Sequence, residues 1–176
     1  MTPQIGDALL IHHISPDLED KVISRITSSP WQHVACVAKN EIVEALPSGV
    51  ISSPLDKYDN PSRYSKLVIT TLKPIPKIES YLGFLKANMG DSYGFLDLFQ
   101  IGVFTLLANI GIKKFLDSKN SVITKNTTPI CSQLYIEAIR AGGLNVFDNI
   151  NAGLISPAKI ADDAMSSSPL FFKLRI

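Results

Sequence analysis

The stretch PWQHVACVAKNEIVEA, residues 30–45, contains two short apolar runs separated by a polar pair. The first run is His33–Ala38, and the second, Glu41–Leu46, begins directly after Lys39-Asn40. A polar pair between two such runs is typical of the tight turn of a β-hairpin. We therefore predict that the two runs are antiparallel neighbours in a sheet.

The position of that turn decides which side chains share a face of the hairpin. With the turn at Lys39-Asn40, residue i pairs with residue 79 − i, and Glu44 becomes a diagonal neighbour of His33 on the same face. A turn through Asn40-Glu41 shifts the register but keeps both residues on one face, whereas a three-residue loop separates them. Diagonal side chains lie roughly 7–8 Å apart and long ones can meet, so a His–Glu pair is expected.

The rest of the chain predicts an α+β protein in which an antiparallel sheet packs on helices. Further strands are expected at Gly6–Ile14, Ser65–Leu72 and Pro169–Ile176. Helices are expected after Ser15, from Ile78 to Met89 with Gly90 as the C-cap, after Asp97, and from Pro129 to Gly142-Gly143. The chain lacks β–α–β alternation, which favours α+β, and its length favours a single domain over residues 1–176.

Cys131 is the candidate nucleophile. If Thr128 is the N-cap, Cys131 is the third residue of its helix, where free backbone N–H groups and the helix dipole favour a thiolate. Apolar residues follow at i+3, i+4, i+7 and i+8, so Cys131 is expected on the inward face. The alternative is a small buried core residue. Cys36 lies on the opposite face of its strand from His33 and is predicted to be structural.

A base and an orienting carboxylate would let this thiol carry out chemistry. His33 is the predicted base, and Glu44 fits the group that orients its imidazole and stabilises the protonated form. The alternative for Glu44 is a half-exposed strand carboxylate. His12 and His13 are adjacent on one strand and point to opposite faces, so they cannot ligate one ion together. No metal or cofactor is predicted.

The composition argues against several classes of function. Seventeen Lys+Arg and sixteen Asp+Glu leave a net charge of +1, which disfavours a nucleic-acid partner. A hydrophobic fraction of 45% with 19% charged residues fits a globular domain. Two cysteines are too few for a disulfide framework or a Cys-rich zinc site.

Targeting signals are weak in this sequence. The N-terminus lacks a basic region and its apolar run Ala8–Ile11 is short, so we expect no signal peptide and a cytoplasmic protein, with non-classical export left open. The most apolar stretch, Leu98–Ile112, is fifteen residues long and contains Gln100 and Asn109. It is shorter than the roughly 20 residues that span a bilayer. A buried core helix is expected there, and a peripheral contact with a membrane or partner is the alternative.

Six segments in this order resemble the permuted papain-like cysteine peptidases. They are GDALLIH, SSPWQHVACVA, EIVEALPSGVI, GDSYGF, TPICSQLYIEAIRAGG and ISPAKIADD, and they run from Gly6 to Asp163. That family contains circularly permuted relatives of the NlpC-type cell-wall endopeptidases, the YiiX/YaeF-like proteins among them. Its permuted members place the cysteine helix after the histidine strands, as this chain does. The resemblance implies a circularly permuted papain-like (NlpC-type) fold with the cysteine at a helix N-terminus.

The resemblance also implies a set of catalytic roles. It makes Cys131 the nucleophile, His33 the base and Glu44 the orienting acid. Tyr93 corresponds to a tyrosine that lines the site and, with the backbone N–H of Cys131, would stabilise the oxyanion. The implied activity is cleavage of an amide bond, in peptidoglycan-type peptides, through an acyl-enzyme intermediate. Gln133 departs from the Glu or Gly that the family often has at that position.

Two other functions stay open at this point. Lecithin–retinol acyltransferase-like relatives share the fold, and the apolar segment Leu98–Ile112 favours a lipid or acyl-ester substrate. The other alternative is a catalytically silent binding or structural module in which Cys131 is a core residue. The expected partner is thus a small peptide, cell-wall or acyl substrate.

Overall fold

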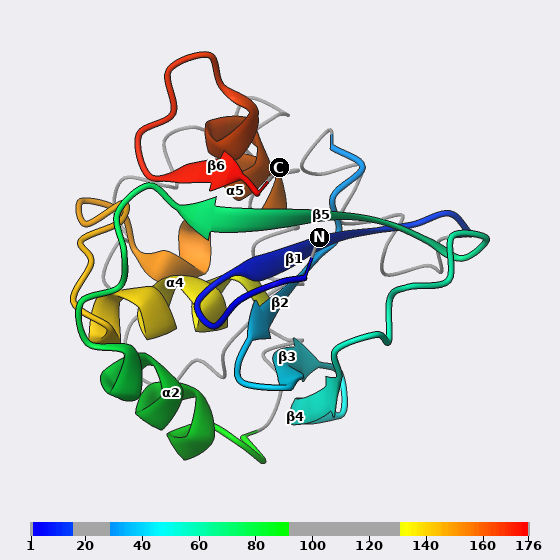
Figure 1. The fold of residues 1–176 in the computed structure, drawn as a ribbon, viewed down its shortest axis with the longest axis horizontal. Helices are drawn as coiled ribbons and strands as arrows, with labels where there is room; N and C mark the ends of the chain where they lie inside the picture. Colours follow the sequence, from blue (N-terminus) through cyan, green and yellow to red (C-terminus); the bar gives the residue numbers. More distant parts are fainter. Residues whose placement is uncertain (1, 16–28, 92–130, 176) are drawn as a thin grey trace, which may run out of the picture.

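The computed structural model describes residues 2–15, 29–91 and 131–175, which form an α+β structure (Figure 1). Its strands are β1 (Ala8–His13), β2 (His33–Val37), β3 (Glu41–Leu46), β4 (Gly49–Pro54), β5 (Tyr64–Thr71) and β6 (Phe172–Leu174). Its helices are α2 (Ile78–Ala87), α4 (Cys131–Ala141) and α5 (Pro157–Met165), and a short 3-10 turn, η2, covers Ala152–Leu154. The predicted α+β class is confirmed.

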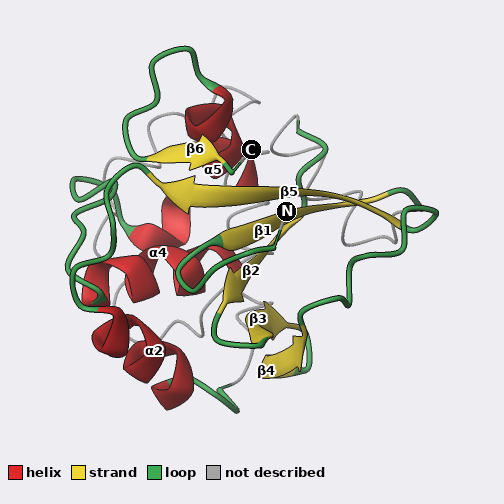
Figure 2. Ribbon diagram, viewed as in Figure 1, coloured by secondary structure: helices red, strands yellow, loops and turns green. Residues whose placement is uncertain are grey.

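The strands form one sheet in the order β4-β3-β2-β1-β5-β6, with every neighbouring pair antiparallel. The central strand, β1, is buried on both faces because successive side chains alternate between them. Ala8 and Leu10 belong to a large core shared with the helices, whereas Leu9 and Ile11 belong to a smaller cluster on the other face. Helices α2 and α4 pack against each other, and α4 packs on β2 and β3 (Figure 2).

Most of the predicted elements in the described residues are present. The expected closing strand near the C-terminus is β6, which pairs with β5, and α4 ends before Gly142-Gly143 as predicted. Three elements were not predicted: the strand β4, the 3-10 turn η2 and the helix α5. The first predicted helix (after Ser15), the segment Leu98–Ile112 and the proposed cap Thr128 lie outside the described residues.

The predicted C-cap of α2 was wrong. The helix ends at Ala87, and Asn88 is its C-cap, with both its backbone N–H and its side-chain amide donating to the carbonyl of Phe84. Gly90 has a φ of +87° two residues further on. Its backbone N–H donates to the carbonyl of Val50, so its left-handed conformation serves the contact with β4 rather than the end of the helix.

Gly49, at the start of β4, is expected to resist substitution. It has a φ of +116°, and a Cβ atom there would lie 2.8 Å from the backbone oxygen of Asp91. We expect Gly49→Ala to lower the free energy of unfolding by about 1–3 kcal/mol, measured by urea denaturation. Gly83→Ala is the control, because Gly83 is exposed in α2 with open space around its Cβ position. That change should stabilise the protein by about 0.5–1 kcal/mol. Equal effects of the two changes would contradict the argument.

A long-range ion pair ties the two ends of the described chain together. The Arg175 side chain contacts both carboxylate oxygens of Asp7, with Nε 2.5 Å from Oδ2 and Nη2 2.8 Å from Oδ1. Arg175 also donates to the Thr70 hydroxyl, and its backbone N–H donates to the carbonyl of Val68. Asp7 is 1% exposed. The ion pair therefore neutralises a buried carboxylate and joins the segment after β6 to the residue before β1.

Within the described ranges, none of the helices combines the length and the apolar character needed to cross a membrane.

Candidate active site

His33 and Glu44 form a buried pair across the predicted hairpin. His33 is the first residue of β2 and Glu44 lies in β3. Cys36 pairs with Val43 and Val37 pairs with Ile42, which is the register of a two-residue turn at Lys39-Asn40. Nε2 of His33 lies 2.8 Å from Oε2 of Glu44, and the two residues are 8% and 0% exposed. The predicted pairing is confirmed, and Glu44 is not a half-exposed strand carboxylate.

Glu44 has further donors that the sequence did not indicate. Nζ of Lys57 lies 2.6 Å from Oε1, and the Tyr58 hydroxyl donates to Oε2 at 2.6 Å. A side-chain hydrogen bond from Ser53 adds to these. Lys57 and Tyr58 belong to the connection between β4 and β5, in a polar sequence, DKYDNP, that predicts only a loop. The sequence offered no signal that this loop reaches Glu44.

These contacts keep Glu44 ionised although it is buried. Burial alone raises the pKa of a carboxyl group, but hydrogen bonds from His33, Lys57 and Ser53 and the charge of His33 outweigh it. The pKa of Glu44 is therefore held well below its ordinary value. An ionised carboxylate accepts hydrogen bonds only, so Nε2 of His33 carries the hydrogen in this pair.

His33 is held in its protonated form by its neighbours. Burial lowers the pKa of an imidazole, but hydrogen bonds with Cys131 and Glu44 and coulombic attraction to both raise the pKa of His33 to about 9. Because Nε2 is directed at Glu44, Nδ1 is the ring nitrogen available to Cys131. His33 thus links the thiol to the carboxylate.

Cys131 is the first described residue of α4 and is 4% exposed. The following residues Leu134, Tyr135, Ala138 and Ile139 are fully buried in the large core, as the spacing predicted. Helix α4 packs on β2 and β3, so the two strands that carry His33 and Glu44 also support the helix that carries the thiol.

The second cysteine lies elsewhere in the fold. Cys36 belongs to the large core on the helix-covered face of the sheet and has no exposed surface. Burial, followed by the nearby charges of Cys131 and Glu44, raises the pKa of its thiol well above the ordinary value. A thiol that stays protonated is inert, which agrees with the structural role predicted for Cys36.

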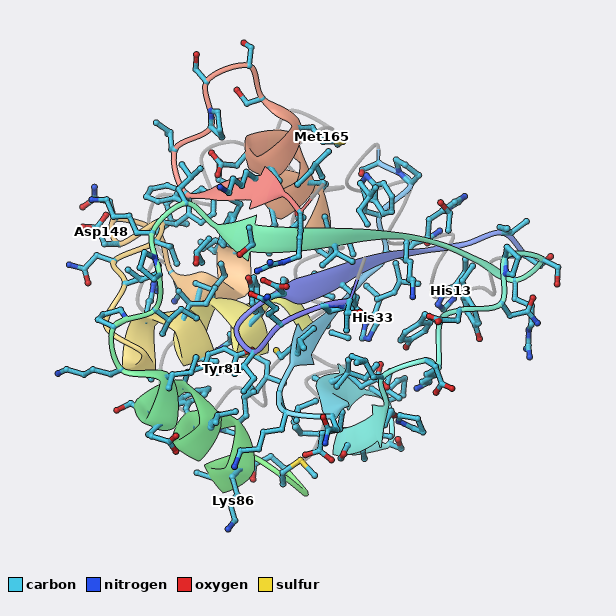
Figure 3. The ribbon with its side chains drawn as sticks, viewed as in Figure 1. His13, His33, Tyr81, Lys86, Asp148 and Met165 are labelled. Carbon is cyan, nitrogen blue, oxygen red and sulfur yellow. The ribbon has the colours of Figure 1, made fainter. Side chains whose placement is uncertain are left out.

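Aromatic rings lie against the His33–Glu44 pair. The ring of Tyr58 lies 6.1 Å from that of His33 and contacts Tyr64 edge-on at 5.0 Å. His13 contacts both tyrosines and lies at the far end of β1 from the helices (Figure 3). His12 instead directs Nδ1 at the carbonyl of Pro30. The two adjacent histidines thus have different surroundings. Tyr93 lies outside the described residues.

The fold and this site define an α+β protein with a buried His–Glu pair beside a helix-borne thiol. Neither a protein-family model nor a curated protein matches the chain. Among solved structures, the chain is similar to the crystal structure of metalloprotein YiiX from Escherichia coli O157:H7, with a TM-score of 0.55 and 18% identity. The match covers 99% of this chain and 89% of that one. The shared feature is the fold.

Proposed function

We propose that this protein is a thiol hydrolase of the circularly permuted papain-like type, with Cys131 as nucleophile, His33 as acid and base, and Glu44 as orienting group. The observation that carries the proposal is the buried His33–Glu44 pair, with Nε2 2.8 Å from Oε2, beside the Cys131 thiol that helps to raise the pKa of His33. A nucleophile, a base and a group that orients the base are the parts that covalent acyl transfer needs. The likeness to YiiX supports only the fold that the proposal needs, while the catalytic roles rest on the sequence resemblance and on the site itself.

The geometry suits a two-step acyl transfer. The Cys131 sulfur attacks the substrate carbonyl carbon, and the carbonyl electrons move to the oxygen, where the backbone N–H of Cys131 would donate a hydrogen bond. The intermediate then expels the leaving amine, which takes the proton of His33, and leaves a thioester on Cys131. Water attacks the thioester while His33 takes a proton from the water, which releases the acid and restores the Cys131 thiolate beside protonated His33. Glu44 holds the imidazole in place throughout. Tyr93 is proposed as a second group at the oxyanion.

The name of the fold neighbour raises the question of a metal ion. The donor set around Glu44 does not fit one, because Lys57, Tyr58 and His33 already occupy both carboxylate oxygens. Across the described ranges, no three His, Cys, Asp or Glu side chains lie close enough to hold an ion. An ammonium group 2.6 Å from a carboxylate oxygen stands where a cation would have to bind.

The proposed substrate is an amide, of the peptidoglycan-peptide type that the resemblance implies. The alternative acyl-ester substrate rests on Leu98–Ile112, which lies outside the described residues. Incubation with purified muropeptides and, separately, with lipid vesicles distinguishes the two. Release of an amine from the muropeptide is expected, and release of a fatty acid from the vesicle would favour the ester.

The rate of alkylation of Cys131 at different pH values tests the proposed chemistry without a known substrate. An ordinary thiol has a pKa of about 8.5 and is less than about 1% thiolate at pH 6. We expect iodoacetamide to label Cys131 at pH 6 at least about tenfold faster in the wild type than in His33→Ala. Peptide mass spectrometry measures both rates, and Cys36 in the same chain is the internal reference.

Two variants serve as controls for this test. Cys131→Ser should remove the fast label, and His12→Ala should keep the wild-type profile, because His12 contacts the carbonyl of Pro30 rather than the site. Labelling of Cys131 that is as slow as that of Cys36 and unaffected by His33→Ala would contradict the proposal. Such a result would instead favour a silent binding module.

A further inference from the structure

The connection between β4 and β5 supplies two of the donors to Glu44. Lys57 reaches Oε1 and Tyr58 reaches Oε2, each at 2.6 Å. The Glu44 side chain has no exposed surface, while 30% of the Lys57 side chain is exposed. Tyr58 is 3% exposed. Two adjacent residues of one loop thus contact both oxygens of this buried carboxylate.

These two residues share the carboxylate oxygens unequally. Oε2 accepts from both His33 and Tyr58, whereas Oε1 accepts from Lys57. A partial rotation of the carboxylate about its terminal bond would break all three contacts together. The orientation of the carboxylate plane toward His33 is therefore fixed by these neighbours and not by the strand alone.

We propose that Lys57 and Tyr58 are positioning residues that act on His33 through Glu44. Tyr58 fixes the orientation of the carboxylate that His33 contacts. Lys57 offsets part of the charge of that carboxylate. The inference rests on the proposed function only for the role given to His33. Neither residue needs to touch the substrate.

The Tyr58 hydroxyl is suited to act as a permanent hydrogen-bond donor to Glu44. Burial, followed by the charge of Glu44 and the hydrogen bond to it, raises the pKa of Tyr58 far above its ordinary value. The Tyr58 hydroxyl therefore keeps its hydrogen over the whole range from pH 6 to pH 9. The ring is held by Tyr64 and lies beside His33, so its hydroxyl has a fixed direction.

Lys57 acts on His33 through charge. Its ammonium lies against Glu44, and a positive charge there weakens the attraction between the carboxylate and the protonated imidazole. Without that charge, Tyr58 and His33 still hold Oε2, so the orientation is kept while the attraction grows. Within the described ranges, the polar and titratable groups around the pair are Cys131 from α4, Cys36 from β2, Ser53 from β4, Lys57 and Tyr58 from the connection, His13 from β1 and Tyr64 from β5.

The first experiment follows the titration of His33 by NMR of the purified, isotope-labelled full chain. The sequence has three histidines, so His12→Gln and His13→Gln assign the signals. We expect Lys57→Met to raise the His33 midpoint by about half a pH unit, the size of an interaction with a partly exposed charge. Lys57→Gln should do the same if Lys57→Met folds poorly, and Lys57→Arg should restore the wild-type midpoint.

Lys66→Met is the matched control for Lys57. Lys66 is similarly exposed, at 28%, but pairs with the exposed carboxylate of Asp59. Its removal should leave the His33 midpoint unchanged. A midpoint that does not rise in either neutral variant of Lys57, or that rises equally in Lys66→Met, would overturn the role given to Lys57.

The second experiment tests the positioning role of Tyr58. Tyr58→Phe keeps the ring and removes the hydroxyl, and we expect alkylation of Cys131 at pH 6 to slow about threefold to tenfold as Oε2 loses one of its two donors. Tyr64→Phe is the control, since that hydroxyl is not among the donors to Glu44, and should keep the wild-type rate. Equal rates for the two variants would overturn the role of Tyr58.

The two proposals can fail separately. If His33→Ala leaves alkylation of Cys131 unchanged, the proposed hydrolase chemistry fails, while the His33 titration still tests the influence of Lys57. The alkylation rate of Cys131 in the wild type can instead be fast and fall in His33→Ala, while the Lys57 and Tyr58 variants behave like their controls. In that case only the positioning inference fails.

Discussion

Replacing Glu44 with alanine is expected to lower the free energy of unfolding by about 3 kcal/mol. The change leaves three donors, from His33, Lys57 and Tyr58, without their common acceptor. Removing one partner of a buried ion pair is costly because the remaining charge stays desolvated. Lys57 can turn toward water, which limits the loss, but His33 and Tyr58 cannot because they are buried. Urea denaturation at pH 7 measures the effect.

Glu41→Ala is the matched control for that prediction. Glu41 lies on the same strand, three residues earlier, but is exposed and accepts a hydrogen bond from the exposed Ser52. Surface changes of this kind alter the free energy of unfolding by less than about 0.5 kcal/mol. If Glu44→Ala cost no more than Glu41→Ala, the carboxylate would not be the centre of the network.

The second large effect is a loss of stability at alkaline pH. The pKa of His33 is raised from 6.5 to about 9, so the folded state holds this proton after the unfolded state has released it. The stabilisation is complete below pH 6.5 and is lost as the pH rises toward 9. Its size is of the order of 2–3 kcal/mol.

Glu44 behaves in the opposite sense, because its lowered pKa gives stability that is lost as the pH falls below about 4.5.

Urea denaturation at pH 6, 7.5 and 9 measures the alkaline effect. We expect the wild type to lose stability across this series and His33→Gln to lose much less. His12→Gln should follow the wild type, since its ring contacts the carbonyl of Pro30 outside the network. An equal slope in the wild type and His33→Gln would show that another group titrates in this range.

The hairpin shows how much of the site was predictable. A short polar pair between two apolar runs has few possible turn geometries, and the alternation of strand side chains then assigns each residue to a face. That reasoning placed His33 and Glu44 together, and the pairing of Cys36 with Val43 confirms its register. Local rules suffice here because the two strands are adjacent in sequence.

The elements that were missed depend on contacts the local sequence does not encode. Strand β4 contains Gly49, two serines and a terminal proline, which weaken a strand signal, and it forms because it pairs with β3 and is bonded to the turn after α2. Lys57 and Tyr58 lie in a loop whose path across the sheet is set by tertiary packing. A polar loop sequence predicts exposure, and only the fold brings it over Glu44.

The contact between Asp7 and Arg175 bears on how the chain assembles during its synthesis. These residues are 168 positions apart, so a ribosome releases the first long before it makes the second. Until residues 172–174 emerge, the edge of β5 that pairs with β6 is open, and such edges invite association with other chains. Strand β6, made long after β1, thus covers the edge of β5, and its completion coincides with the pairing of Arg175 with the buried Asp7.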